Sequence, residues 1–227
     1  MRAAGQGSAA EGRFHDEFGI WIRAPLMSGA DLRPALFLDR DGVIVEDRGY
    51  LSRAEDVVLL PGAASLIASA NRRNIPVVEV TNQAGIARGY YGWEKFLEVE
   101  LALARQLASN GAAIDAVFAC PFHPDGAPPW AHPAHPARKP RPGMLLAAQQ
   151  FAHLDLTRSW IVGDKMDDLL AGYHAGLCGG LHVLTGEGPA HRAGVLAWHH
   201  PGFEVVCGNS IGDAGELIEL LSCSRGD

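Results

Sequence analysis

Short apolar runs separated by helix-like repeats dominate the pattern of hydrophobic and polar positions along this chain. The runs are continuous rather than alternating, which is typical of strands buried on both faces of a sheet. We predict strands at residues 35–38, 76–80, 114–119, 159–163 and 180–185, with a weaker one at 203–206. Apolar residues at helical spacing predict helices at residues 63–73, 92–110, 138–153, 164–175 and 213–221. This alternation predicts an α/β fold with a mostly parallel, doubly wound sheet, in which several strand ends open onto one crevice.

The N-terminus and one internal loop fall outside this alternation. Residues 1–30 form an N-terminal extension, and residues 1–15 are rich in Gly, Ala and Ser, so we expect disorder there. The apolar segment 18–26 is expected to pack on the domain. Residues 31–222 are predicted to form a single domain with a loop insert at residues 120–137. That loop is rich in proline and histidine, and irregular loops of this length usually have a function.

Composition and charge restrict the classes of function. The chain has 227 residues, of which 48% are hydrophobic and 20% charged, as expected for a globular protein with a sizeable core. Its formal net charge of -7 and its lack of a Lys/Arg-rich run argue against nucleic acid as the main partner. It has no signal-peptide pattern and no apolar span approaching ~20 residues, so we expect no membrane association. Four widely spaced cysteines without a C-x-x-C pair fit a reducing compartment, and we expect a cytoplasmic monomer.

Two acidic residues follow the first predicted strand. Asp39 and Asp41 come directly after the run at 35–38, and Gly42 indicates that the backbone turns there. The carboxyl ends of strands in open α/β sheets are where ligands bind. Such a pair has three common uses: one acid attacks or binds a metal while the other moves protons, both bind a hard cation, or both are merely solvated. The pair alone leaves all three open.

Polar groups at three further strand ends favour phosphoryl transfer. Thr81 and Asn82 follow the second predicted strand. Arg138 and Lys139 come after the third, and Asp164 follows the fourth. A carboxylate attacks phosphorus as a nucleophile when Mg²⁺ and cationic donors offset the negative charges of the reactants. The four strand ends together supply these parts.

This chemistry gives each group an expected role. We expect Asp39 to attack phosphorus and, with Asp164, to hold Mg²⁺ through hard oxygen ligands. Asp41 is expected to protonate the leaving oxygen and then to deprotonate the hydrolytic water. Thr81 and Lys139 would donate hydrogen bonds to the phosphoryl oxygens. A receiver-like module that stores an acyl phosphate uses similar groups, and Asp41 separates the two classes because turnover requires a proton shuttle.

Four motifs in this order resemble those of the haloacid dehalogenase (HAD) superfamily. They read F-L-D-R-D-G at residues 37–42, V-T-N-Q at 80–83, R-K-P at 138–140 and V-G-D-K-M-D-D at 162–168. The resemblance covers roughly residues 35–185, and four ordered motifs are far more specific than any one of them. It implies a Rossmann-like sheet and a further Mg²⁺ ligand from the main-chain carbonyl of Asp41. Asp168 in the last motif either orients Lys165 or the metal-bound waters, or serves the helix dipole.

Within the superfamily the chain is most similar to the D-glycero-D-manno-heptose-1,7-bisphosphate 7-phosphatases, which have almost no cap domain. The supporting segments are D-R-G-Y at residues 47–50 and the continuation of V-T-N-Q into A-G-I-A-R-G. The resemblance implies a small phosphorylated sugar as substrate and Mg²⁺ as cofactor, with histidinol phosphate or another small metabolite as the alternative. The residues implied to contact the substrate are Arg40, Asp47, Arg48, Gly49, Tyr50, Thr81, Asn82, Gln83, Ala84, Arg138 and Lys139. Lys165 is a further candidate because it follows Asp164 directly.

The loop at residues 120–137 departs from the family pattern. The family often binds a structural Zn²⁺ there through C-x-H, followed by C-x-C directly before Arg-Lys-Pro. Here the first part reads C-P-F-H, and His135 and Ala137 stand in the two later cysteine positions. One interpretation is a zinc site with one sulfur and three nitrogen ligands, from Cys120, His123, His132 and His135. The other is a proline-stiffened loop with solvated histidines.

Overall fold

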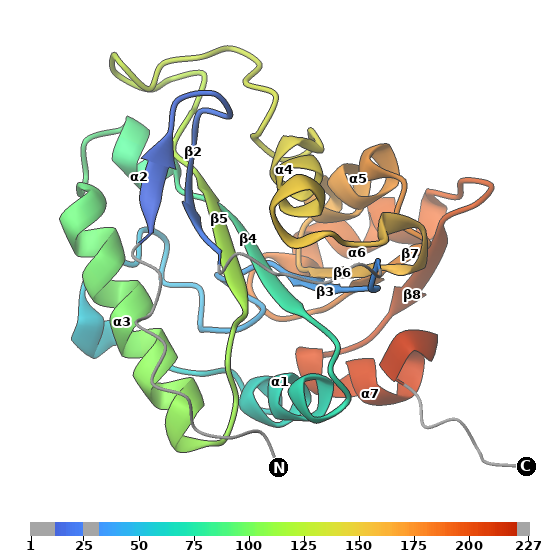
Figure 1. Ribbon diagram of the computed structural model, residues 1–227. Coiled ribbons are helices and arrows are strands. Elements are labelled where there is room, and N and C mark those ends of the chain that lie inside the picture. The colour runs from blue at the N-terminus through green and yellow to red at the C-terminus, as the bar shows by residue number, and fades with distance from the viewer. Residues whose placement is uncertain (1–11, 25–31, 222–227) are drawn as a thin grey trace, which may run out of the picture.

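A computed structural model describes residues 12–24 and 32–221 of the chain. The strands of its sheet are β1 (Arg13–His15), β2 (Ile20–Arg23), β3 (Leu36–Leu38), β4 (Val77–Asn82), β5 (Ala116–Cys120), β6 (Trp160–Gly163), β7 (Gly179–His182) and β8 (Glu204–Cys207). Their order across the sheet is β1-β2-β5-β4-β3-β6-β7-β8 (Figure 1). Strands β3 to β8 run parallel, and β1 and β2 add an antiparallel edge next to β5. The predicted mostly parallel, doubly wound sheet is confirmed.

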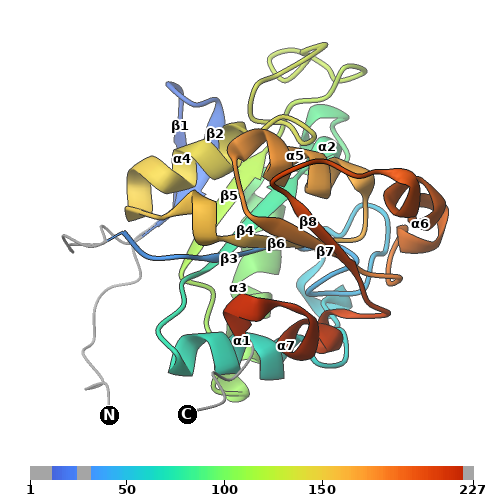
Figure 2. The same cartoon turned by 90° about the vertical axis from the view of Figure 1, so that its right-hand side faces the viewer.

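Helices cover both faces of this sheet. They are α1 (Ala63–Arg72), α2 (Ala84–Ala87), α3 (Trp93–Ser109), α4 (Gly143–Ala152), α5 (Met166–Ala175), α6 (Gly188–Ala197) and α7 (Ala214–Leu217). Helices α1, α3 and α7 pack on one face, and α4, α5 and α6 pack on the other (Figures 1 and 2). Hydrophobic clusters therefore lie on both faces of the sheet.

The central strand β3 shows why the predicted strands are continuously apolar. Leu36, Phe37 and Leu38 are all fully buried. Because side chains alternate along a strand, Leu36 and Leu38 enter the core beneath α1 and α3, while Phe37 enters the core beneath α4 and α5. Such a strand has no polar position until the chain leaves the sheet. Asp39, its first polar residue, therefore marks the carboxyl end.

The N-terminal region contributes two strands that the hydrophobic pattern does not predict. β1 and β2 form an antiparallel pair, and β2 continues the sheet by pairing Trp21 with Ala119 of β5. The expected packing of the apolar segment is confirmed, because Ile20, Trp21 and Ile22 are buried. Disorder is wrong for residues 13–15, which are too few to show a strand pattern. Residues 1–11 and 25–31 lie outside the described residues.

Three elements in the second half differ from expectation. Helix α4 begins at Gly143 rather than at residue 138, because each of Pro140 and Pro142 disfavours a helical residue before it. Helix α6 is missing from the predicted set, although parallel strands β7 and β8 require a crossover between them. The expected last helix is broken into α7 and two 3-10 turns, at Ile211–Asp213 and Glu219–Leu221.

Loops rather than an inserted domain lie around the carboxyl ends of the strands. The connection from β3 to α1 spans residues 39–62 and contains one 3-10 turn, Ala54–Asp56. The connection from β5 to α4 spans residues 121–142 and is irregular apart from an isolated bridge between His123 and Ala131. In the described ranges, the structure has no helix with the length and apolar character needed to cross a membrane.

Candidate active site

Three neighbouring strands bring polar residues to one edge of the sheet. β3 ends directly before Asp39 and β6 directly before Asp164, while Thr81 and Asn82 are the last residues of β4. β4 and β6 pair with β3 in parallel, one on each side, so their carboxyl ends meet. Lys139 joins them from the loop before α4. These strand ends surround a cavity of about 300 Å³, in the place where open α/β sheets bind ligands.

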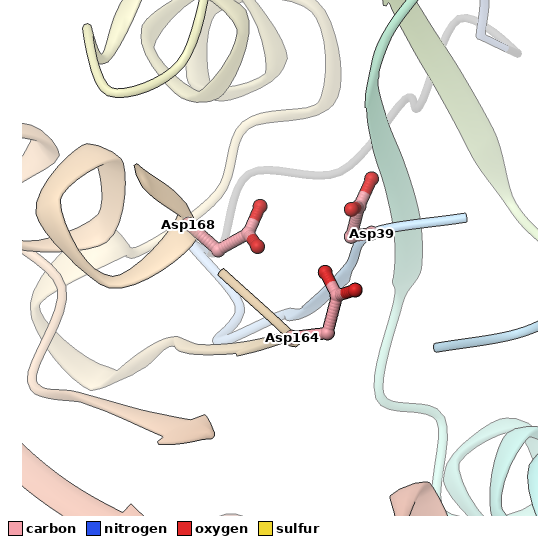
Figure 3. A group of neighbouring side chains, drawn as sticks. All are labelled: Asp39, Asp164 and Asp168. Atoms are coloured by element: carbon pink, nitrogen blue, oxygen red, sulfur yellow. The ribbon is translucent and has the colours of Figure 1, made fainter. Parts of the chain in front are cut away.

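Asp39, Asp164 and Asp168 are buried carboxylates that point toward one another (Figure 3). One oxygen from each lies within 4.8 Å of the others. Burial, followed by the charges of Asp39 and Asp168, raises the pKa of Asp164 to about 8. Burial also raises the pKa of Asp168 to about 6, although Lys139 opposes this shift. The group therefore concentrates negative charge that a cation would neutralise.

The surroundings of Asp164 fit a hard divalent cation. Its Oδ2 accepts a hydrogen bond of 2.7 Å from the main-chain N–H of Glu187. Its Oδ1 is buried and has no hydrogen-bond partner among the described residues, which is costly unless a metal ion or water satisfies it. A Cβ atom at Gly42 would lie 2.5 Å from Oδ2, and Gly42 has φ of +84°, so this close approach requires glycine. Asp39 and Asp164 thus suit the predicted magnesium ligands.

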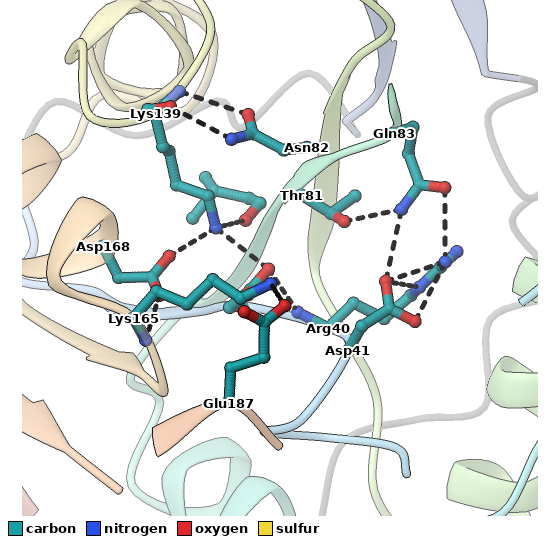
Figure 4. Close-up of polar contacts among 11 residues, drawn as sticks. Arg40, Asp41, Thr81, Asn82, Gln83, Lys139, Lys165, Asp168 and Glu187 are labelled. Carbon is teal, nitrogen blue, oxygen red and sulfur yellow. Dashed lines mark hydrogen bonds and ion pairs between the residues drawn. The ribbon is translucent and has the colours of Figure 1, made fainter. Parts of the chain in front are cut away.

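Lys139 is a fixed cation at the centre of the group. Its Nζ lies 2.9 Å from Asp39 Oδ1 and 2.6 Å from Asp168 Oδ1, and it donates to the carbonyl of Val80 at 2.8 Å. Burial alone would lower the pKa of Lys139, but Asp168 and Asp39 outweigh it and raise the pKa. The side chain of Asn82 bonds both the N–H and the carbonyl of Lys139, each at 3.1 Å (Figure 4). Strand β4 therefore sets the position of this lysine.

Asp168 makes contacts both at the start of helix α5 and with a cation of the site, so both of its predicted kinds of role remain possible. Its Oδ2 accepts a hydrogen bond of 3.1 Å from the N–H of Lys165 at the start of α5, which is a helix-capping contact. Its Oδ1 forms the ion pair with Lys139. The Lys165 ammonium group turns instead to Glu187 Oε1, at 2.8 Å. Asp168 therefore caps helix α5 and holds the ammonium group of Lys139 at the same time.

Asp41 points away from the acidic group and contacts Arg40 (Figure 4). Its Oδ2 accepts hydrogen bonds from Arg40 Nε at 3.1 Å and from Nη2 at 2.9 Å. Gln83 Nε2 lies 3.4 Å from the same oxygen and donates to Thr81 Oγ1 at 2.7 Å. Burial raises the pKa of Asp41, and the charge of Arg40 opposes this shift. A carboxyl that holds a proton more readily suits an acid that donates one.

The cavity brings together most of the residues predicted to contact the substrate. Arg48 is the exception, because it is half exposed, forms a 2.8 Å pair with Glu46 and does not line the cavity. Those that line it are Arg40, Asp47, Gly49, Tyr50, Thr81, Asn82, Gln83, Ala84, Arg138, Lys139 and Lys165. Lining residues not predicted to contact the substrate include Gly85, Arg88, Tyr91, His123, Asp167 and Glu187.

Arg88, which was not predicted, and Arg138, which was, add positive charge to the lining of the cavity. Arg88 follows α2, donates to Tyr50 Oη at 2.5 Å and lies 3.2 Å from His123 Nε2. Arg138 donates to the carbonyl of Phe122 at 3.1 Å and lines the same cavity. Arg88 belongs to the A-G-I-A-R-G segment, which gave a signal for it. Glu187 directly precedes α6, the helix that was not predicted, so no signal was available.

The structure does not assemble the four-ligand zinc site. In the described part of the chain, the one group of three or more acidic, histidine or cysteine side chains close enough to share a metal is Asp39, Asp164 and Asp168. The histidine Nδ1 atoms of the loop accept hydrogen bonds from main-chain N–H groups two residues later. His135 stacks on Phe122 with ring centroids 3.8 Å apart. Ring stacking and loop turns, rather than metal bonds, hold these side chains.

Comparison with known proteins identifies the family. A family model described as HAD-hydrolase-like matches residues 136–207. The chain is 46% identical over 209 residues to D-glycero-beta-D-manno-heptose-1,7-bisphosphate 7-phosphatase of Mesorhizobium japonicum, covering 91% of this chain and 89% of the relative. This chain belongs to the HAD superfamily. Within it, the chain is a member of the heptose-bisphosphate phosphatase family. The chain is also 42% identical to D-glycero-alpha-D-manno-heptose-1,7-bisphosphate 7-phosphatase of Burkholderia mallei, covering 72% of this chain and 85% of the relative.

Solved HAD structures support the same assignment. A HAD-like protein from Mesorhizobium loti superposes with a TM-score of 0.78 at 43% identity, covering 92% of this chain and 95% of that one. D,D-heptose 1,7-bisphosphate phosphatase from B. bronchiseptica, complexed with magnesium and phosphate, superposes with a TM-score of 0.71 at 30% identity. That comparison covers 81% of this chain and 96% of the other. Family membership makes this chain a phosphatase of the HAD type.

Proposed function

We propose that this HAD phosphatase removes the 7-phosphate of D-glycero-D-manno-heptose 1,7-bisphosphate. The observation that carries the proposal is the position of Asp39. It lies at the end of the central strand, lines the cavity, is 2.9 Å from Lys139 Nζ and has an oxygen within 4.8 Å of one of Asp164. The attacking carboxylate thus lies beside both a fixed positive charge and a metal ligand. The names of the relatives that cover most of the chain support the choice of substrate.

Asp39 and Asp41 divide the chemistry between them. An oxygen of Asp39 attacks the phosphorus, and the bond from phosphorus to the sugar oxygen breaks as an aspartyl phosphate forms. Asp41 gives a proton to the departing sugar oxygen. A water molecule then gives its proton to Asp41 and attacks the phosphorus, which releases inorganic phosphate and restores Asp39.

Lys139 and Thr81 offset the charge of the phosphoryl group. Lys139 is held beside Asp39 by its three contacts, so its charge needs no rearrangement during the reaction. The Thr81 hydroxyl accepts a hydrogen bond from Gln83, which leaves its own hydrogen to donate to a phosphoryl oxygen. Both groups lie in the wall of the cavity.

Asp39 and Asp164 would hold magnesium, together with the main-chain carbonyl of Asp41. When bound, Mg²⁺ neutralises charge on the attacking carboxylate and on the phosphate. Asp168 supports the site by its ion pair with Lys139. We leave zinc out of the proposal, and metal analysis of protein purified without added metal checks this choice. A zinc content near one per chain would contradict it.

The walls of the cavity match a sugar that carries two phosphates. A volume of about 300 Å³ is at the lower end of the range for small-molecule sites. Asp47 and Asp167 offer acceptors for sugar hydroxyls. Arg88 and Arg138 offer cations for a second phosphate. A substrate with a single phosphate would lack the interactions that a second phosphate can make with these arginines.

A comparison of substrates tests the proposed function. We expect kcat/KM for heptose 1,7-bisphosphate to exceed that for histidinol phosphate by at least about 100-fold, because the second phosphate contributes charge-assisted hydrogen bonds. Both anomers are assayed, since relatives named for each anomer match the chain. A preference for histidinol phosphate would overturn the substrate while leaving the phosphatase chemistry intact.

A further inference from the structure

Arg40 is among the residues that line the cavity, but its side chain is buried. Its side chain is 1% exposed, and its guanidinium carbon lies 5.5 Å from the centre of the Phe96 ring. Nε and Nη2 both donate to Asp41, and Nη2 also lies 3.3 Å from Gln83 Oε1 (Figure 4). The remaining nitrogen, Nη1, donates to Glu100 Oε1 at 3.0 Å. The protein thus contacts this guanidinium on every nitrogen.

Glu100 reaches this network from outside the active site. It lies in the middle of α3 on the face that packs against the sheet, and its side chain is 5% exposed. It does not line the substrate cavity but borders a separate cavity of about 110 Å³ together with Arg23. A buried carboxylate in a helix usually destabilises a protein unless it is paired, so its retention here needs a reason.

Glu79 lies close to the same buried region. Strand alternation places Val78 and Val80 in the core beneath α4 and α5, and therefore Glu79 and Thr81 on the α3 face. Both oxygens of Glu79 are buried without a hydrogen-bond partner among the described residues. Burial, followed by the charge of Glu100, raises the pKa of Glu79 well above its ordinary value. Of these two glutamates, it is therefore Glu100 whose carboxylate forms an ion pair with Arg40.

We propose that Glu100 is a positioning residue for the phosphatase reaction: it fixes Arg40, and Arg40 in turn holds the carboxyl of Asp41. The inference rests on the proposed role of Asp41 as the group that protonates the leaving oxygen. Two hydrogen bonds from one planar guanidinium fix both the distance and the plane of a carboxylate. Without Glu100, Arg40 keeps its charge but loses the contact that sets its rotation. Asp41 would then be present but misaligned.

Substrates that differ in the leaving group separate this role from a merely structural one. A sugar oxygen needs a proton as it leaves, whereas p-nitrophenolate leaves without one. The parameter kcat/KM reports the step in which the leaving group departs and is not affected by later hydrolysis of the aspartyl phosphate. A general acid contributes about 10²- to 10⁴-fold. We therefore expect Glu100→Leu to lower kcat/KM for heptose 1,7-bisphosphate about 100-fold, and for p-nitrophenyl phosphate less than about threefold.

Conservative and control variants make the test specific. Glu100→Gln keeps an oxygen that accepts from Arg40, so we expect a smaller loss of about tenfold on the sugar substrate. Glu98→Gln changes an exposed, ion-paired glutamate on the same helix and should leave kcat/KM for both substrates unchanged. In an Arg40→Lys background, Glu100→Leu should not change the ratio of the two kcat/KM values any further. Both substitutions break the same connection from Glu100 through Arg40 to Asp41.

Each other result overturns the proposal. Glu100 variants that lower kcat/KM equally on both substrates, or on neither, would contradict it, and so would additive effects of the Arg40 and Glu100 changes. If the wild-type enzyme hydrolyses p-nitrophenyl phosphate but not the heptose compound, the proposed substrate fails. Phenyl phosphate then replaces the sugar substrate in the same comparison, because phenolate is more basic than p-nitrophenolate and depends more on protonation as it leaves. Thermal unfolding of each variant shows whether it is folded.

Discussion

Lys139 is the residue on which the charge balance of the site depends. It contacts Asp39 and Asp168 in a buried group that also contains Asp164. Lys139→Met removes this cation and leaves two acids unpaired, so we expect a destabilisation of about 3 kcal/mol or more. We also expect phosphate release to fall by at least about 10³-fold, since the fixed positive charge that offsets the phosphoryl group is lost.

Urea unfolding and phosphate release measure these two effects. Lys95→Met serves as the control, because Lys95 is an exposed lysine paired with Glu98 and its loss should change neither quantity. A Lys139→Met enzyme that kept a tenth of the wild-type rate would contradict the role given to this lysine.

His182 at the end of β7 gives the protein a pH-dependent stability. It is fully buried, and burial, followed by the charge of Arg192, lowers its pKa to about 4. The unfolded chain binds this proton more readily than the folded one, so stability is fully present above about pH 6.5 and is lost as the pH falls toward 4. We expect this residue to account for a loss of about 2 kcal/mol between about pH 7 and about pH 5.

Urea unfolding at the two pH values isolates this contribution. In His182→Gln the drop in unfolding free energy should be smaller than in the wild type by that amount. His199→Gln, at an exposed histidine, should leave the drop unchanged. Equal drops in wild type and His182→Gln would remove His182 as the cause.

Active-site residues could be predicted from the sequence where the proposed phosphoryl transfer requires one particular type of side chain. Asp39 and Asp164 were identifiable because they directly follow strand ends, and Lys139 because it belongs to the R-K-P motif between them. Glu100 could not be, because a glutamate within an amphipathic helix is normally solvated and its burial depends on tertiary packing. The sequence left two interpretations of the histidines in the loop at residues 120–137 for a related reason. Suitable ligand types were present, but spacing alone does not show that their Nδ1 atoms accept hydrogen bonds from the loop's own backbone.

At the scale of elements, the N-terminal strand β2 supports the helix that carries Glu100. Trp21 is 4% exposed and packs on Phe96, with ring centroids 5.3 Å apart, and on Trp93. We expect Trp21→Ala to destabilise the protein by about 3–5 kcal/mol, because a large buried ring leaves a cavity. Phe96 also faces Arg40, so some loss of activity should accompany this change.

Denaturant unfolding measures the effect of Trp21→Ala. Leu101→Ala on the exposed face of α3 is the matched control and should change stability by less than about 0.5 kcal/mol. A destabilisation of less than about 1 kcal/mol for Trp21→Ala would show that β2 is dispensable for the fold.

Elements were predictable where many apolar positions repeat. The six parallel strands and the long helix α3 have that signal, and Gly111 behind α3 has φ of +70°, the left-handed conformation that is common directly after a helix. The strands β1 and β2 are too short to show a period, and they form because the edge of β5 is available to pair with. Helix α6 has a weak pattern with Pro189 in its first turn, and topology rather than periodicity requires it.

At the scale of the whole molecule, metal binding and folding are coupled through the acidic group. Without a cation, the burial of Asp39, Asp164 and Asp168 and the repulsion among them oppose folding, as the raised pKa of Asp164 indicates. We expect saturating Mg²⁺ to raise the Tm of the wild-type protein by about 5 °C or more. Asp164→Asn should show little such rise, and without metal it should have a higher Tm than the wild type.

Differential scanning calorimetry with Mg²⁺ and with a chelator measures these shifts. The exposed acid Glu98, changed to Gln, is the control and should leave the Mg²⁺-dependent rise intact. The same rise in wild type and Asp164→Asn would place the metal elsewhere.

The central claim is that Asp39 accepts the phosphoryl group from position 7 of the heptose bisphosphate. Phosphorus NMR during turnover of D-glycero-D-manno-heptose 1,7-bisphosphate tests it most directly, with wild-type enzyme and Asp39→Asn compared under the same Mg²⁺ conditions. We predict that the wild type converts the substrate to heptose 1-phosphate and inorganic phosphate, and that Asp39→Asn forms neither. Loss of the 1-phosphate signal instead, or turnover by Asp39→Asn, would contradict the claim.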